Sequence, residues 1–306
     1  MVLGLAILFN YLAAIHVYSL TQFAEHGKRS PFFAEMTLKE KVETAFFGLS
    51  IPKPRARRFP HDVGLNYQSI VLKTSDGVSV RGWDIRASPT KGVILMLHGY
   101  GGEKSRLLDE AIAFIELGLH PILIDFRGHG ESDSIATTIG YKEVEEIKSA
   151  LQFIRKAYPG KEIFLYGKSM GAAAALRAAG PGQEKVSGLI LECPFDGLVE
   201  AIRNRMYFFN APRYGIPDLL MLWGSILGGF NGYNHNPTTY AEWIRVPTLM
   251  MGGADDSRAK PEEIEKVYLA LPSSQKKLKI FSRTGHNDIF QKNKRDWKSN
   301  IQDVVL

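Results

Sequence analysis

The sequence has a single cysteine, Cys193, and this scarcity excludes an internal disulfide. It has neither paired Cys-x-x-Cys units nor a His-Glu-x-x-His pattern, so the commonest zinc-binding spacings are absent. Cys193 ends an apolar run, where a small core residue is expected rather than a nucleophile. The sequence therefore predicts no metal site.

A continuous basic stretch of the kind that binds nucleic acid is also missing. The formal net charge is +6 over 306 residues, but the Lys and Arg residues lie in scattered groups at 53–58, 276–279 and 292–298. No aromatic side chains alternate with them, as they do in nucleic-acid-binding motifs. We therefore expect no nucleic-acid partner.

The N-terminus lacks the features of a cleaved signal peptide. No Lys or Arg precedes the apolar run at residues 1–20, and no good small-x-small cleavage site follows it. As a helix, about 20 residues span roughly 30 Å, which is enough to cross a bilayer. We expect residues 1–22 to form a single membrane anchor. The alternative is an amphipathic helix packed on the protein or lying on a membrane surface.

The charges that follow this segment predict its orientation. Lys28, Arg29, Lys39 and Lys41 lie within about 20 residues after the apolar run, on its C-terminal side only. The positive-inside rule places that side, and with it the rest of the chain, in the cytoplasm.

Residues 23–60 are predicted to contain a short amphipathic helix and a basic linker. Thr37 and Glu40 have the spacing of a capping box at the start of a helix over residues 37–49. Pro52 and Pro54, with the arginines after them, are typical of a linker.

Strand and helix patterns alternate over residues 61–306, and an apolar content of 45% is ample for a large core. Strands are expected at residues 67–73, 78–85, 93–97, 121–124, 162–166, 188–191, 248–251 and 278–281. Helices are expected at residues 105–117, 141–158, 261–271 and from about 288, besides one after Ser169. This alternation predicts an α/β fold with a mostly parallel, doubly wound sheet, helices on both faces and an antiparallel hairpin at its start.

Residues 196–245 interrupt the alternation. The segment is rich in large apolar side chains, as at residues 206–209 and 219–223, and also contains several glycines and prolines. A solvated loop would not be expected to carry so many of them. We expect a small helical cap over the carboxyl edge of the sheet, where it could form an apolar pocket.

Ser169 lies between two glycines, Gly167 and Gly171, after an apolar strand pattern and before an alanine-rich helix pattern. A sharp turn between strand and helix holds a serine hydroxyl out at the carboxyl edge of the sheet, and side chains at the flanking positions would collide with neighbouring elements. The pattern therefore predicts that Ser169 is a nucleophile.

A serine nucleophile needs a base and a group that orients the base. Only two of the eight histidines follow Ser169. His286 comes directly after the last expected strand, at the same sheet edge as Ser169, whereas His235 lies in the cap in a turn-like context. We expect His286 to be the base. Either Asp255 or Asp256, after the strand before the last one, could orient it.

Two backbone N–H groups should stabilise the negative charge that develops on the substrate oxygen. Met170 begins the helix after Ser169, where unpaired amides and the helix dipole favour an anion. Tyr100 lies in the loop after the central strand. We expect these two residues to form the oxyanion hole.

Together, these motifs resemble the α/β-hydrolase superfamily, and its lysophospholipase-like and serine-aminopeptidase-like group in particular, some members of which carry an N-terminal membrane segment. The motifs are HGYGG at 98–102, DFRGHGES at 125–132, GKSMG at 167–171, DD at 255–256 and GHND at 285–288. The resemblance implies an eight-stranded sheet, no cofactor and ester hydrolysis through an acyl-enzyme. It also implies a structural role for the loop that contains His129, while Met251 departs from the pattern because many relatives have a second histidine there.

The resemblance also favours one of the two carboxylates. Relatives usually place a helix-starting Pro-Glu about five residues beyond the catalytic acid, and Pro261 stands five residues beyond Asp256 but six beyond Asp255. We therefore expect Asp256 to orient His286. Asp255 is expected to be a turn residue whose side chain bonds to nearby backbone N–H groups.

The predicted function is that of a serine hydrolase that cleaves carboxylic esters of apolar, small-molecule or lipid-like acyl substrates. A peptidase or amidase on the same fold is the alternative, although the cap is poor in the acidic residues that would anchor a free amino terminus. A non-catalytic, membrane-tethered binding protein that keeps the fold is a third possibility.

Overall fold

The computed structural model describes residues 2–31, 33–86, 91–180, 184–207 and 212–304. This part of the chain contains a sheet of eight strands in the order β1-β2-β4-β3-β5-β6-β7-β8. The strands are β1 (Tyr67–Lys73), β2 (Ser79–Ile85), β3 (Gly92–Leu97), β4 (Leu119–Ile124), β5 (Glu162–Lys168), β6 (Gly188–Glu192), β7 (Thr248–Gly253) and β8 (Lys276–Phe281). β2 pairs antiparallel with β1 and β4, and the remaining neighbours are parallel. The predicted mostly parallel eight-stranded sheet is confirmed.

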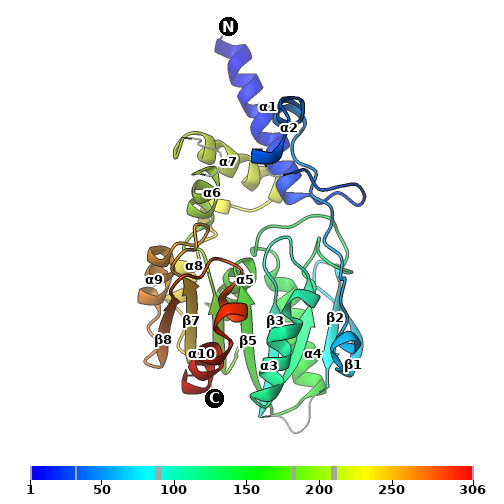
Figure 1. Cartoon of the computed structure of the whole chain (residues 1–306), viewed down its shortest axis with the longest axis vertical. Helices are drawn as coiled ribbons and strands as arrows, with labels where there is room; N and C mark the ends of the chain where they lie inside the picture. The colour runs from blue at the N-terminus through cyan, green and yellow to red at the C-terminus, as the bar shows by residue number, and fades with distance from the viewer. Residues whose placement is uncertain (1, 32, 87–90, 181–183, 208–211, 305–306) are drawn as a thin grey trace.

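Helices cover both faces of the sheet. The elements on the two faces are α3 (Leu108–Glu116) and α10 (Ile289–Val304) on one side, and α4 (Val144–Ala157), α5 (Met170–Ala179), α8 (Pro237–Ala241) and α9 (Pro261–Ala270) on the other (Figure 1). Every residue of β3 and β4 is buried, as expected for parallel strands that are covered on both faces. The rings of Phe114 and Trp297, 4.9 Å apart, join α3 to α10.

Two helix starts differ from the sequence pattern. The segment predicted as one helix from residue 105 begins with a 3-10 turn, Lys104–Leu107, before α3. α4 begins at Val144 rather than at residue 141. The reason is a tight turn before it, in which the Glu143 carboxylate accepts the N–H groups of Thr138 at 2.8 Å and Gly140 at 2.9 Å.

The segment predicted as a cap is helical. It contains α6 (Leu198–Tyr207), α7 (Ile216–Gly228), a 3-10 turn (Gly232–Asn234) and α8. Its side chains share a buried cluster with α5 of the sheet domain, formed by Ala173, Phe195, Leu198, Ala201 and Met221. Phe208 and Phe209, part of the predicted apolar set, lie outside the described residues.

The N-terminal part packs at the same end of the molecule as the cap (Figure 1). α1 (Val2–Thr21) lies along α7 and α2 (Leu38–Phe47). Among the described helices, α1 is long and apolar enough to cross a membrane, with a mean hydropathy of 1.7. α2 starts with the predicted capping box, in which Thr37 N–H donates to Glu40 Oε2 at 2.7 Å and Glu40 N–H to Thr37 Oγ1 at 3.3 Å.

The stretch predicted as a linker is instead bound to the domain. Pro52 pairs with Ala24, the Pro54 carbonyl accepts the Gly130 N–H at 2.9 Å, and Lys53 Nζ donates to the Ser134 carbonyl at 3.0 Å. Prolines remove backbone donors but leave carbonyls that neighbouring loops can use, so this segment is part of the folded surface rather than a free tether.

Candidate active site

Ser169 occupies a sharp turn between β5 and α5. Its backbone angles, φ 52° and ψ −112°, are ones that non-glycine residues rarely adopt. The flanking glycines make the turn possible: a Cβ at Gly171 would lie 2.3 Å from the Leu97 carbonyl oxygen, and one at Gly167 would lie 2.5 Å from the Gly171 carbonyl oxygen. Backbone crowding therefore requires glycine on both sides, as the sequence pattern predicted.

Two neighbouring segments contact the backbone at Ser169. Its N–H donates to the Glu192 carbonyl at the end of β6 over 2.7 Å. The loop after β3 lies on another side, so close that a Cβ at Gly99 would be 3.5 Å from Ser169 Cβ. This contact brings the next residue, Tyr100, to the edge of the sheet at which the partly buried Ser169 lies.

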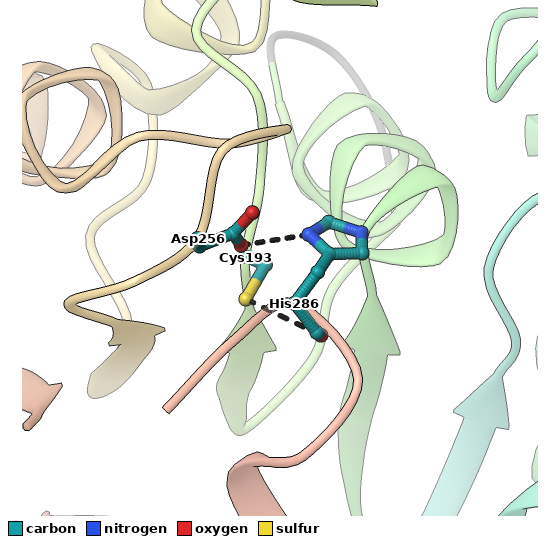
Figure 2. Close-up of side chains that lie close together, drawn as sticks. All are labelled: Cys193, Asp256 and His286. Carbon is teal, nitrogen blue, oxygen red and sulfur yellow. Dashed lines mark hydrogen bonds and ion pairs between the residues drawn. The ribbon is translucent and has the colours of Figure 1, made fainter. Parts of the chain in front are cut away.

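Asp256 and His286 form a hydrogen-bonded pair at the same edge (Figure 2). His286 Nδ1 lies 2.7 Å from Asp256 Oδ2, and Asp256 Oδ1 accepts the N–H groups of Arg258 at 2.9 Å and Ala259 at 3.0 Å. Burial alone would raise the pKa of Asp256, but the hydrogen bonds outweigh burial and lower the pKa. The ionised carboxylate keeps the proton of His286 on Nδ1 and leaves Nε2 as the basic nitrogen.

Asp255 is not bonded in the way that the sequence suggested. Its side chain is exposed and makes no hydrogen bond within the described ranges, while its backbone N–H donates to the Thr284 carbonyl at 3.0 Å. The local turn bonds expected of Asp255 belong to Asp256. The physical reason is that Asp256 faces inward, so that one carboxylate oxygen caps the following turn while the other binds His286.

Ser169 and His286 are linked through the segment that follows β6. The Glu192 carbonyl accepts the Ser169 N–H, and the next residue, Cys193, places Sγ 3.8 Å from the His286 carbonyl oxygen (Figure 2). Within the part of the chain that the structure describes, Ser169 Oγ makes no hydrogen bond. A direct bond from Ser169 to His286 is therefore not part of this structure.

Cys193, Asp256 and His286 could hold a metal ion by proximity alone, since their ligand atoms lie within 4.8 Å of one another. Their chemistry does not favour it. Burial and the neighbouring Asp256 carboxylate raise the pKa of the Cys193 thiol, and a protonated thiol is a poor metal ligand. Asp256 already accepts hydrogen bonds on both oxygens. Cys193 is thus a buried core residue, in keeping with its apolar sequence context.

His98 and His129 are buried, and both nitrogens of each ring are engaged. One nitrogen of each ring bonds a carbonyl and the other accepts a backbone N–H: His98 Nδ1–Gly99 O 2.9 Å, His98 Nε2–Phe126 N 3.1 Å, His129 Nδ1–Arg127 O 2.8 Å and His129 Nε2–Gly101 N 3.2 Å. Burial lowers the pKa of both imidazoles. These neutral rings order the loops on which Tyr100 lies and have no free nitrogen for catalysis.

His235 is likewise structural. Its Nε2 lies 3.0 Å from the Ile139 carbonyl oxygen and its Nδ1 lies 3.2 Å from the Tyr240 hydroxyl, while burial lowers its pKa to about 4. The ring connects the cap to the turn before α4.

Tyr100 follows Gly99 in the loop beside Ser169, and Met170 directly follows Ser169. Met170 is the first residue of α5, where no preceding turn supplies an acceptor for its N–H. The Tyr100 side chain packs against the core of the sheet domain, and its hydroxyl donates to the Leu20 carbonyl at the end of α1 over 2.7 Å. Burial raises the pKa of this phenol to about 12. No pattern in the sequence indicates this contact.

Comparison with known proteins agrees with this architecture. A family model described as serine aminopeptidase, S33, matches residues 88–215. An esterase of Pyrococcus furiosus, Pf2001, superposes with a TM-score of 0.68 at 23% identity over 83% of this chain and 97% of that one. The chain has the α/β-hydrolase fold.

Two further proteins resemble this chain in sequence. The uncharacterised membrane protein YNL320W of Saccharomyces cerevisiae is 26% identical over 75% of this chain and 76% of its own length. Human monoglyceride lipase is 29% identical over 45% of this chain and 46% of its own length. These similarities support a hydrolase function.

Below the nucleophile turn, the α/β-hydrolase domain has a buried polar network that sequence reasoning missed. Lys168 Nζ lies 2.9 Å from Glu110 Oε1 and 3.6 Å from Glu192 Oε2. Glu192 Oε1 also accepts the Tyr166 hydroxyl at 2.8 Å and the Trp297 indole N–H at 2.6 Å. In the sequence, the only indication of this network was the charged residue Lys168 between Gly167 and Ser169.

Proposed function

We propose that the protein is a serine hydrolase that cleaves carboxylic esters of apolar acyl substrates through an acyl-enzyme. The observation that carries the proposal is the hydrogen bond of 2.7 Å between His286 Nδ1 and Asp256 Oδ2, at the sheet edge where Ser169 stands in its strained turn. A buried, ionised acid on Nδ1 leaves Nε2 to accept a proton, which is the state that a general base requires.

Each residue then has a role. Ser169 Oγ attacks the ester carbonyl carbon while His286 Nε2 takes the hydroxyl proton, and Asp256 stabilises the imidazolium. The same proton passes to the leaving alkoxide, which departs as the alcohol. Water, activated by His286, next attacks the acyl-enzyme and releases the carboxylic acid and free Ser169.

The negative oxygen of each tetrahedral intermediate is assigned to the N–H groups of Met170 and Tyr100. Met170 lies at the N-terminus of α5, where the helix dipole adds to the hydrogen bond. Gly99 lies against Ser169 and directly precedes Tyr100, so that the second donor would approach from the opposite side. No step requires a cofactor or a metal.

Ester preference is supported by the character of the cap and by the relatives. The cap contributes Phe195, Leu198 and Met221 to an apolar cluster at the catalytic edge. Among the relatives are a lipase that is named for monoglycerides and a membrane protein. We take the substrate to be a lipid-like ester and α1 to hold the protein at a membrane, with the catalytic domain on the cytoplasmic side.

Replacement of the nucleophile tests the proposal. Ser169→Ala should lower the hydrolysis of p-nitrophenyl esters by roughly 10³-fold or more and abolish covalent labelling by a fluorophosphonate, with an unchanged folded signal. A matched control is Ser225→Ala, because Ser225 lies in the cap and its hydroxyl donates to the Met221 carbonyl at 2.9 Å. Labelling that persists in the Ser169→Ala protein would refute the assignment.

Peptide hydrolysis is the second candidate, because the matching family model is named for serine aminopeptidases. An aminopeptidase needs a carboxylate to hold a free amino group. Three cap acids already form ion pairs: Asp196 with Lys266 at 2.9 Å, Glu200 with Arg213 at 2.7 Å and Asp218 with Arg203 at 3.0 Å. Turnover of aminoacyl-anilides that exceeds turnover of esters of graded chain length would favour the peptidase. A failure to turn over either class would favour the non-catalytic binding protein.

A further inference from the structure

The second half of α1 packs on the cap through polar and apolar contacts. The Trp223 indole N–H of α7 donates to Asn10 Oδ1 over 3.1 Å. Ala13 and Val17 of α1 form a buried cluster with Leu220 of α7. An amide side chain on an apolar helix needs a partner wherever water is scarce, and α7 supplies it for Asn10.

α2 packs against the same half of α1. The Tyr11 hydroxyl donates to the Phe46 carbonyl over 3.1 Å, and His16 Nε2 lies 3.1 Å from the Ala45 carbonyl oxygen. The polar side chains in the middle of α1 are therefore bonded to α2 and α7. α1 and these two helices form one unit.

Only the first half of α1 projects beyond this unit. Its large apolar side chains are exposed, from 38% at Leu8 to 80% at Val2. At a rise of about 1.5 Å per residue, residues 2–9 reach roughly 12 Å, whereas a bilayer core is about 30 Å thick. This free half matches the depth of about one leaflet. α1 cannot cross both leaflets without drawing α2 and α7 into hydrocarbon.

α2 sets how deep the unit can enter. Lys39 and Glu43 are on one side of the helix, with side chains 84% and 55% exposed. Such charges resist burial in hydrocarbon. Leu38, Val42 and Phe46 are four residues apart and form an exposed apolar stripe directly beside these charges. An exposed apolar stripe bordered by charges can contact the membrane interface but cannot enter the centre of the hydrocarbon, so α2 limits the depth of insertion.

α7 extends the apolar surface. Leu222 and Ile226 lie one turn apart on its outer side, 46% and 58% exposed. α1, α2 and α7 gather at one end of the molecule, at the catalytic edge of the sheet and far from the C-terminus (Figure 1). We name the exposed apolar side chains of residues 2–9, α2 and α7 the membrane face.

We propose that the membrane face inserts into a single leaflet of a phospholipid bilayer. The free half of α1 enters the hydrocarbon, and α2 and α7 lie at the interface, so that the carboxyl edge with Ser169 faces the lipid surface. The inference deepens the proposed function, because a lipid-like ester would reach Ser169 directly from that leaflet. It replaces the expected full membrane crossing with insertion from one side.

A bilayer fits this surface better than a second copy of the chain. The apolar side chains are continuous with a projecting helix, which a flat interface between two copies would not accommodate. Lys28 and Arg29 are exposed in the loop after α1 and would contact anionic headgroups. Phosphatidylserine should therefore strengthen binding to phosphatidylcholine vesicles.

Cysteine labelling tests the depth of insertion, since Cys193 is buried and will not react. Three single-cysteine variants of the full chain are made: Leu3→Cys, Ile226→Cys and Leu269→Cys. Each is labelled with an environment-sensitive fluorophore and bound to phosphatidylcholine–phosphatidylserine vesicles that contain brominated lipids as quenchers. Leu269 is a matched control, 68% exposed on α9. We expect quenching at Leu3 by bromines deep in the chains, at Ile226 by shallow bromines and none at Leu269.

Several outcomes would overturn the proposal. Reaction of Leu3→Cys with an impermeant thiol reagent from the far side of the vesicle would show a full crossing. If brominated lipids do not quench the label at Ile226, α7 does not lie at the lipid surface. If a second labelled copy of the chain quenches that label instead, the apolar surface is a dimer interface. Repeating the quenching with Ser169→Ala separates this test from the proposed function, because insertion needs no turnover.

Affinity gives an independent measurement. Leu222→Asn combined with Ile226→Asn should weaken the binding of the full chain to vesicles on the order of tenfold, because both side chains leave the lipid. Leu269→Asn should have no effect. Hydrolysis of a water-soluble ester should stay unchanged in both proteins, which shows that they are folded. Equal affinity of both variants and the wild type would contradict the proposal.

Discussion

The Tyr100 hydroxyl donates a hydrogen bond of 2.7 Å to the Leu20 carbonyl, and thereby ties the loop of the proposed oxyanion hole to the last turn of α1. Phe23 strengthens the connection, since its ring centroid lies 5.6 Å from that of Tyr100 and 4.7 Å from that of His129. The N-terminal helix thus supports the catalytic edge as well as the membrane face. Removing residues 1–20 to obtain a more soluble protein would also remove this support.

Tyr100→Phe should therefore lower turnover although it leaves the backbone N–H in place. The Leu20 carbonyl loses its donor, so we expect a loss of about 1–2 kcal/mol in the free energy of unfolding and a several-fold decrease in kcat for a water-soluble ester. Urea denaturation and steady-state kinetics measure the two effects. Tyr233→Phe is the control, because the exposed Tyr233 hydroxyl bonds the Asp218 carbonyl far from Ser169. Equal kcat in both variants would show that α1 does not support the loop.

The two neighbouring carboxylates should differ sharply. Asp256→Asn should cost on the order of 10³ to 10⁴ in turnover, because an amide in place of the carboxylate favours the wrong tautomer of His286. Asp255→Asn should cost at most about tenfold, because Asp255 is exposed and bonds His286 with neither oxygen. Single-turnover rates of the two variants, measured side by side, check the assignment. A larger loss in Asp255→Asn would reverse it.

Lys168→Met should destabilise the fold, since it leaves Glu110 and Glu192 buried without their cation. Breaking a buried ion pair on one side costs roughly 3–5 kcal/mol in the free energy of unfolding. Lys148→Met is the control, because its pairing with Glu145 is partly exposed and should matter by less than about 1 kcal/mol. Urea midpoints of the two proteins measure the difference. Similar midpoints would mean that the network is not needed for stability.

Acid should destabilise the protein through its buried, neutral histidines. Burial lowers the pKa of His98, His129 and His235, the last to about 4, so below pH of about 6.5 the unfolded chain binds protons that the folded chain does not. Stability is complete above that pH and falls as pH decreases, by about 1.4 kcal/mol per pH unit for each such histidine. For His235 the loss ends near pH 4. Denaturation at pH 7.5 and 5.5 measures the slope, and His235→Gln should make it shallower. An identical slope in that variant would contradict the role of His235.

The sequence predicted the sheet and the nucleophile turn because both depend on local patterns. An apolar run as short as β3, followed by glycines, favours a strand covered on both faces. Backbone crowding leaves no alternative to glycine at Gly167 and Gly171. The local spacing left Asp255 and Asp256 equal, and the choice of Asp256 came from the resemblance, in which a Pro-Glu such as the one at Pro261 follows the acid by about five residues. These features require information from only a few neighbouring residues.

The contacts of α1 could not be predicted, because they join residues far apart in the chain. Hydropathy measures the average apolarity of α1 but not the direction in which Asn10 and Tyr11 point. Their partners, Trp223 and Phe46, lie 213 and 35 residues away. The linker was misassigned for the same reason, since prolines and arginines do not reveal that a neighbouring loop will bind their carbonyl groups.

Cys193 sits directly behind the acid and the base, with Sγ 3.8 Å from the His286 carbonyl oxygen, although it takes no part in the proposed chemistry. Any reagent small enough to modify this thiol would add bulk between Asp256 and His286 and push them apart. Because the thiol is buried, a mercurial or maleimide would reach it, and remove activity, only after this part of the interior opens. Sensitivity to such reagents would therefore report the opening of this part of the interior rather than a cysteine nucleophile.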